Sequence, residues 1–113
     1  MPESFNRTST ALTTTSITDI YAAPSGNADD RAVVLSCLAA NINGTDAIDV
    51  SVQVATSGDT KLSSIAHTIT VPADASIELV ANKLILKQGE KLRATATIAS
   101  GIDFTVGSLE ITV

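Results

Sequence analysis

The sequence is most distinctive for the residue types that it has few of. Its 113 residues include one cysteine, one histidine and no tryptophan, and only 3% of them are aromatic. A single thiol cannot form an internal disulfide, so the fold does not depend on an oxidising compartment. A lone histidine falls short of the ligand set that zinc needs. The scarcity of aromatic rings disfavours a surface that stacks on sugars or on nucleobases.

Basic residues and long apolar runs are also scarce. Seven Lys and Arg against twelve Asp and Glu leave a net charge of −5, and the basic residues are scattered along the chain. This argues against a nucleic-acid partner. No apolar run approaches the roughly 18 residues that span a bilayer, and the first ten residues lack the apolar core of a secretory signal. We therefore expect neither a nucleic-acid nor a membrane partner, and synthesis in a cytoplasm.

The chain is rich instead in Val, Ile, Leu, Ala and Thr. Branched side chains and Thr favour strands, because their restricted χ1 angles suit a pleated surface. In residues 91–98, apolar Leu92, Ala94, Ala96 and Ile98 alternate with polar residues, which is the period of a half-buried strand. No segment has a sustained helical period. Frequent turn signals complete the pattern of an all-β, single-domain β-sandwich, jelly-roll-like, with eight or nine strands.

The chain divides into two parts by composition. Residues 1–8 are polar and without periodicity, and we assign them to an N-terminal arm. Residues 9–113 form the β-sandwich domain. Late in this domain, two short apolar segments flank a predicted turn at Ala81-Asn82.

Two local signals predict how strands connect and pair. Asn43-Gly44 is the strongest hairpin signal, because both residues tolerate the positive φ of a type I′ turn. It predicts that a strand over about 31–41 pairs with one over about 47–55. At Gly107 the apolar alternation of the last strand slips by one residue, which predicts a β-bulge there.

The strand over residues 31–41 carries apolar side chains on both faces. The opposite sheet can cover one of them. We expect the other to be covered by the Thr-rich N-terminal segment or by a second subunit, so that this strand is central or interfacial.

Few residues could carry chemistry. His67 is best interpreted as a residue at a sheet margin or a subunit contact, and Cys37 as a small buried hydrophobe. The Asp residues cluster near turns, where Asp is favoured by bonding to the local backbone, although such turns leave calcium binding open. We therefore predict no catalytic residue, no metal ligand and no cofactor.

Several segments carry a resemblance to a known family. A Thr-rich start, the "NGTD" hairpin, the "VPADASIEL" turn, "KLILKQGEKLRA" and the closing "SLEIT" resemble small virion structural proteins of tailed bacteriophages. The resemblance covers nearly the whole chain except the arm. It implies a compact β-sandwich on the particle, found as a capsid decoration (cement) protein, commonly trimeric, or in the neck or tail.

The resemblance leads to a functional expectation. We expect a non-enzymatic virion protein that binds itself, as a homotrimer, and the major capsid protein or neck and tail proteins. The alternative is a receptor- or glycan-binding β-sandwich module of a tail fibre. The candidate interface residues lie on the two-faced strand (Val34, Leu38 and Ala40) and in the arm (Phe5 and Arg7).

Overall fold

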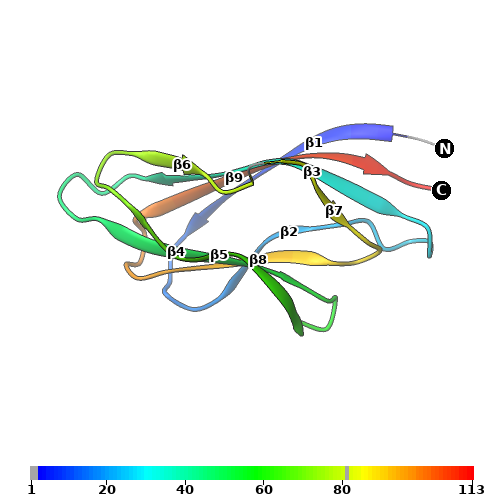
Figure 1. The fold of residues 1–113 in the computed structure, drawn as a ribbon, viewed down its shortest axis with the longest axis horizontal. Helices are drawn as coiled ribbons and strands as arrows, with labels where there is room; N and C mark the ends of the chain where they lie inside the picture. Colours follow the sequence, from blue (N-terminus) through cyan, green and yellow to red (C-terminus); the bar gives the residue numbers. More distant parts are fainter. Residues whose placement is uncertain (1–2, 81) are drawn as a thin grey trace.

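Two antiparallel β-sheets pack face to face in the computed structural model, which describes residues 3–80 and 82–113 (Figure 1). The strands are β1 (Glu3–Leu12), β2 (Thr18–Ala22), β3 (Arg31–Asn41), β4 (Ile48–Ala55), β5 (Lys61–Val71), β6 (Ser76–Glu78), β7 (Leu84–Leu86), β8 (Lys91–Ala96) and β9 (Ile102–Ile111). The predicted turn at Ala81-Asn82 falls between β6 and β7, but Ala81 lies outside the described residues.

The strand order is that of a jelly roll. One sheet runs β1-β9-β3, with β6 and β7 both paired to β3, and the other runs β2-β8-β4-β5. The chain thus changes sheet between β1 and β2, between β2 and β3, and again between β3 and β4. Two sheets connected in this way are typical of the jelly roll, which consists of two Greek keys. The predicted all-β sandwich is confirmed.

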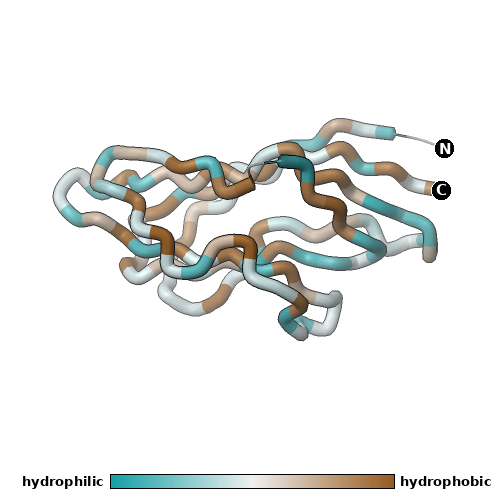
Figure 2. The backbone as a smooth tube through the Cα atoms, in the orientation of Figure 1, coloured by the Kyte–Doolittle hydropathy of each residue, from teal (hydrophilic) through white to brown (hydrophobic). Residues whose placement is uncertain are grey.

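The core lies between the inner faces of the two sheets. Every second residue of a strand points inward, and those positions are apolar along most strands. Figure 2 shows apolar positions alternating with more polar ones along the chain. Phe104 is the largest fully buried side chain, and Leu12, Ile20, Ile48 and Leu92 pack into the same core. The sandwich is therefore filled mainly by aliphatic side chains around one phenyl ring.

The predicted hairpin at Asn43-Gly44 is wrong. β3 and β4 belong to different sheets, so the segment between them crosses from one sheet to the other. Neither residue has a positive φ. The Asn43 side chain instead accepts hydrogen bonds from the backbone N–H groups of Thr45 and Asp46, which is the Asx-type turn that competes with a hairpin.

The predicted bulge lies on the other strand of the pair. β9 pairs with β1 over its whole length without a shift, so Gly107 holds no extra residue. The shift falls between Val34 and Ser36 of β3, where Leu35 is the extra residue opposite the Gly107 region. β9 keeps its phase, and Ser108 follows Val106 into the interior. The apolar residues that follow Gly107 at odd-numbered positions of β9 therefore point outward.

The described part of the predicted arm, residues 3–8, continues directly into residues 9–12 as one strand. Glu3 pairs with Ile111 and Leu12 with Ile102, so β1 forms the edge of its sheet beside β9. The Thr-rich segment thus extends the sheet sideways and does not lie across the outer face of β3. That outer face is accordingly left without cover from β1.

Replacing Phe104 tests the position of the core. We expect Phe104→Ala to lower the free energy of unfolding by about 3–5 kcal/mol, because it opens a large cavity between the sheets. Leu62→Ala is the control, since Leu62 is 52% exposed on β5, and its effect should stay within about 0.5 kcal/mol. Urea unfolding followed by circular dichroism measures both. Similar losses for the two variants would contradict this packing.

Candidate interaction surface

Four apolar side chains line up across the outer face of the β1-β9-β3 sheet. Phe5 of β1 is opposite Leu109 of β9, Leu109 is opposite Val33 of β3, and Val33 is opposite Ile85 of β7. Residues opposite one another on neighbouring strands point to the same face of a sheet. These residues thus form one row across four strands, here called the apolar row.

The apolar row is open to solvent at both ends. Phe5 is 77% exposed and Ile85 is 66% exposed, while Val33 and Leu109 between them are half-buried. Leu35, the bulged residue, and Leu38, further along β3, are also exposed. Several large apolar groups gathered on one face of a small domain indicate an interaction surface.

Charged residues border the apolar row on both sides. On one side, the neighbouring row of paired residues consists of Glu3 of β1, Ile111 of β9 and Arg31 of β3. On the other side, Arg7 of β1 is opposite Gly107. None of the three charged side chains takes part in an ion pair within the described chain. Glu3 and Arg7 are exposed, so their charges are available to a partner, whereas Arg31 donates to the backbone carbonyls of Ala28 and Asp30.

Four of the five predicted interface residues lie on this face. On β1, Phe5 and Arg7 are opposite Leu109 and Gly107, which point outward from β9. On β3, Leu38 and Ala40 alternate with buried residues. Val34 does not belong with them, because it is fully buried between the sheets, and the apolar residues of β3 alone could not show which of them point inward. The role of the other four in an interface stays a prediction.

Sequence reasoning missed the remaining members of this face. Ile85 lies in one of the two short apolar segments late in the domain, and Leu109 and Ile111 follow the predicted bulge at Gly107. The signal that could have identified Leu109 and Ile111 is the odd-numbered phase of the last strand, which is opposite to that of Ile102 and Phe104. It becomes interpretable only when the pairing of the strand is known.

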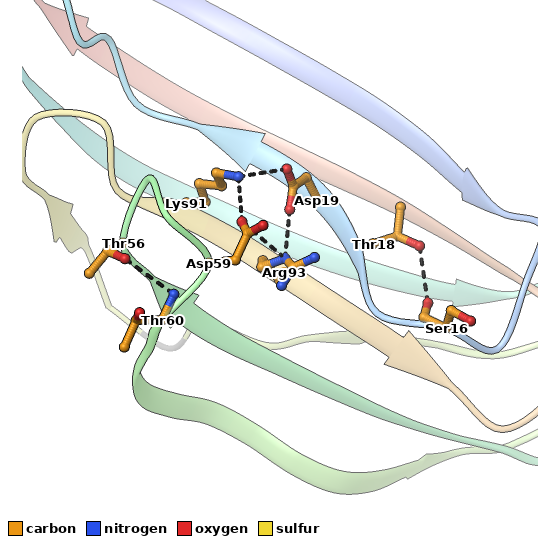
Figure 3. Close-up of polar contacts among 8 residues, drawn as sticks. All are labelled: Ser16, Thr18, Asp19, Thr56, Asp59, Thr60, Lys91 and Arg93. Atoms are coloured by element: carbon orange, nitrogen blue, oxygen red, sulfur yellow. Dashed lines mark hydrogen bonds and ion pairs between the residues drawn. The ribbon is translucent and has the colours of Figure 1, made fainter.

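The outer face of the other sheet is polar and carries an ion-pair cluster of Asp19, Asp59, Lys91 and Arg93 (Figure 3). The Lys91 ammonium lies 3.0 Å from the carboxylate of Asp19 and 2.6 Å from that of Asp59. Arg93 donates from Nε to Asp19 at 2.7 Å. The two cations thus share two carboxylates, and the opposing charges are satisfied within the chain.

The cluster shifts the pKa values of Asp19 and Lys91. Partial burial alone would raise the pKa of Asp19, but the hydrogen bonds and charges of Lys91 and Arg93 outweigh it and hold the pKa below 3.8. Hydrogen bonds to Asp59 and Asp19 raise the pKa of Lys91. Both groups therefore stay charged throughout the neutral range.

The remaining reactive side chains are placed apart from one another. His67 lies exposed on β5, an edge strand of the second sheet. Tyr21 donates to the carboxylate of Glu110 at 2.6 Å beside an open, polar hollow between β1 and β2. Burial, together with that carboxylate, raises the pKa of Tyr21, so the phenol stays protonated.

The described residues offer no grouping of metal ligands. Among residues 3–80 and 82–113, no three side chains of His, Cys, Asp or Glu come close enough to hold an ion together. Within the same residues, no helix has the length and apolar character needed to cross a membrane.

Comparison with known proteins finds likeness in structure. Neither the family models nor the curated proteins give a match to this chain. A subunit of the Bacillus endospore appendages, described as a novel family of disulfide-linked pili, superposes with a TM-score of 0.60 at 15% identity, covering 99% of this chain and 88% of that one. A chain from the acid-stable capsid of Helicobacter pylori bacteriophage KHP30 superposes with a TM-score of 0.56 at 13% identity, covering 97% and 87%.

A larger capsid protein contains the same fold as one part. A chain of the infectious bursal disease virus particle superposes with a TM-score of 0.58 at 8% identity, and covers 96% of this chain. This chain spans 30% of that viral protein. At such identities the likeness shows the jelly-roll fold, and the fold is one that viral capsids and a pilus share.

The ion-pair cluster should make stability depend on pH. Because the pKa of Asp19 is lower in the folded chain than its ordinary 3.8, its ion pairs stabilise the fold above that value and are lost as the pH falls through the folded pKa. Asp19→Asn should therefore flatten the decline of the unfolding midpoint below pH 3.8. The effect should be small, because the Asp19 side chain is 46% exposed. Asp29→Asn, outside the cluster, should keep the slope of the parent protein.

Cys37 should be unreactive in the folded chain. Burial, together with the charge of Glu78, raises the pKa of the Cys37 thiol to about 12, and the side chain is fully buried. We expect a chromogenic disulfide reagent to label it at mildly alkaline pH only in urea, at the rate of global unfolding. Rapid labelling of the native protein would contradict this assignment.

Proposed function

We propose that this protein is a non-enzymatic structural component of a bacteriophage virion. It acts as a capsid decoration (cement) protein that binds as an oligomer to the lattice of the major capsid protein. The apolar row on the outer face of the β1-β9-β3 sheet is the observation that carries this proposal. A rigid sandwich with one adhesive face is what a protein that joins other subunits requires.

The fold supports the proposal at a coarser level. The capsid chain of phage KHP30 matches along nearly the whole of this chain, so a domain of this size and topology is used in a phage capsid. The pilus subunit matches as well, but it is described as part of a disulfide-linked assembly. Cys37 is fully buried and held in a strand of the core, which disfavours that kind of covalent linkage here.

A trimer suits the role, as the family resemblance implies. A closed cyclic assembly of three chains matches the three-fold and quasi-three-fold positions of an icosahedral lattice. Leu38 and Ala40 lie on the outer face of β3 at the end away from the charged residues Glu3 and Arg31. We place the trimer contact at these two residues.

A neck or tail component is the second form of the same role. Quantitative gels of purified virions distinguish the two, because a decoration protein is present in copies on the order of hundreds, and a neck or tail ring in about a dozen. Absence of the protein from purified virions would overturn both forms. Binding of glycan arrays by the isolated protein would favour the tail-fibre alternative instead.

Replacing Leu38 tests the trimer contact. Leu38→Asp places a charge on an outward, 36% exposed position of β3, and we expect light scattering to show that the three-chain oligomer is lost. The β-sheet circular dichroism should be unchanged, because the position lies outside the core. Leu62→Asp, on the exposed part of β5, is the control and should leave the oligomer intact. A Leu38→Asp protein of unchanged mass would overturn this contact.

A further inference from the structure

The free edge of β1 is an open template for another strand. β1 pairs with β9 alone among the described strands, and the pairing runs from Glu3 to Leu12 without a register shift. Edge strands are usually protected by bulges, Lys, Pro or a cover. β5, one of the two edge strands of the second sheet, shows such protection: its pairing with β4 shifts at three places, Thr68 has a φ of 54°, and Lys61 begins the strand.

The outward side chains of β1 are complementary to themselves. Glu3, Phe5 and Arg7 are every second residue of β1 and so share the outer face. Glu3 and Arg7 are about 13 Å apart along their own strand and cannot meet within one chain. When a second β1 runs antiparallel with its Phe5 opposite this Phe5, each Glu3 is opposite the Arg7 of the other copy.

We propose that two copies of this chain join through their β1 strands, antiparallel and related by a two-fold axis at Phe5. Residues 3–7 of one copy pair with residues 7–3 of the other. The contact contains an aromatic pair at its centre and an oppositely charged pair on each side, which are the favourable cross-strand combinations. Because the same patch is used by both copies, the interface is isologous and closed.

The two-fold contact also extends the apolar row. Phe5 lies at one end of that row, followed by Leu109, Val33 and Ile85. Across the axis the row continues into the same residues of the second copy. In the dimer, the apolar rows of the two copies thus form one continuous apolar surface. This contact does not rest on the proposed virion role, because it concerns the chain alone.

A cysteine at the axis provides the first test. In Phe5→Cys the two introduced thiols are opposite one another, at a spacing that a disulfide can span. We expect mild oxidation at high protein concentration to produce disulfide-linked dimers on non-reducing gels. Ser9→Cys is the matched control, because Ser9 is exposed on the same face of the same strand but has no symmetric partner in this register. Oxidation of Phe5→Cys no faster than Ser9→Cys overturns the proposal.

A charge exchange provides the second test, in the Phe5→Cys background. Glu3→Arg and Arg7→Glu each replace two attractive pairs with two repulsive ones, so each variant alone should form disulfides about tenfold more slowly. Mixing the two variants restores both attractive pairs. Mass spectrometry of the mixture should then find mixed dimers well above their share in random pairing. Lys61→Glu, with the same change of charge as Arg7→Glu, should have no effect. Random pairing in the mixture overturns the proposed register.

Discussion

The pairing of β3 with β9 is the interaction on which the rest of the structure depends. This pairing determines which residues of β3 and β9 face the core and which face outward. On the inside it brings Cys37 and Ala39 beside Val106 and Phe104, which form part of the core. On the outside it places Val33 beside Leu109. The bulge at Leu35 adjusts the register between these two regions, so that the inner and the outer rows are both continuous.

The sequence predicts best what depends on one strand alone. The alternation in β8 identified its inward residues correctly, because the side-chain period of a strand is a local property. The turn at Asn43-Gly44 was misread, since turn chemistry does not reveal whether the following strand pairs beside the first or crosses to another sheet. The slip near Gly107 was detected, but a register belongs to two strands, and the extra residue proved to be Leu35 of the partner. For the same reason, Val34 and Leu38 could not be assigned to a face of the sheet before the register of β3 with β9 was known.

The two outer faces of the sandwich differ in how favourably their side chains are solvated. On the β2-β8-β4-β5 sheet, Asp19, Asp59, Lys91 and Arg93 satisfy one another, so that face is well solvated and gains little from a partner. On the other sheet, apolar side chains remain exposed beside charges that have no ion-pair partner within the described chain. A partner there would remove apolar surface from water and complete the charged pairs. The asymmetry therefore favours binding through one sheet only.

The two contacts proposed for this sheet would not compete with each other. A strand added at the edge of β1 lies in the plane of the sheet, whereas a subunit bound at Leu38 and Ala40 lies on its face. Both can be occupied in one molecule. A ring closed by face contacts is finite by itself, but two-fold edge contacts would link rings to one another. Three-fold and two-fold contacts on one subunit are the combination that covers a closed shell, and a fibre does not require it. The two proposed contacts together would therefore suit the proposed capsid role better than a linear assembly would.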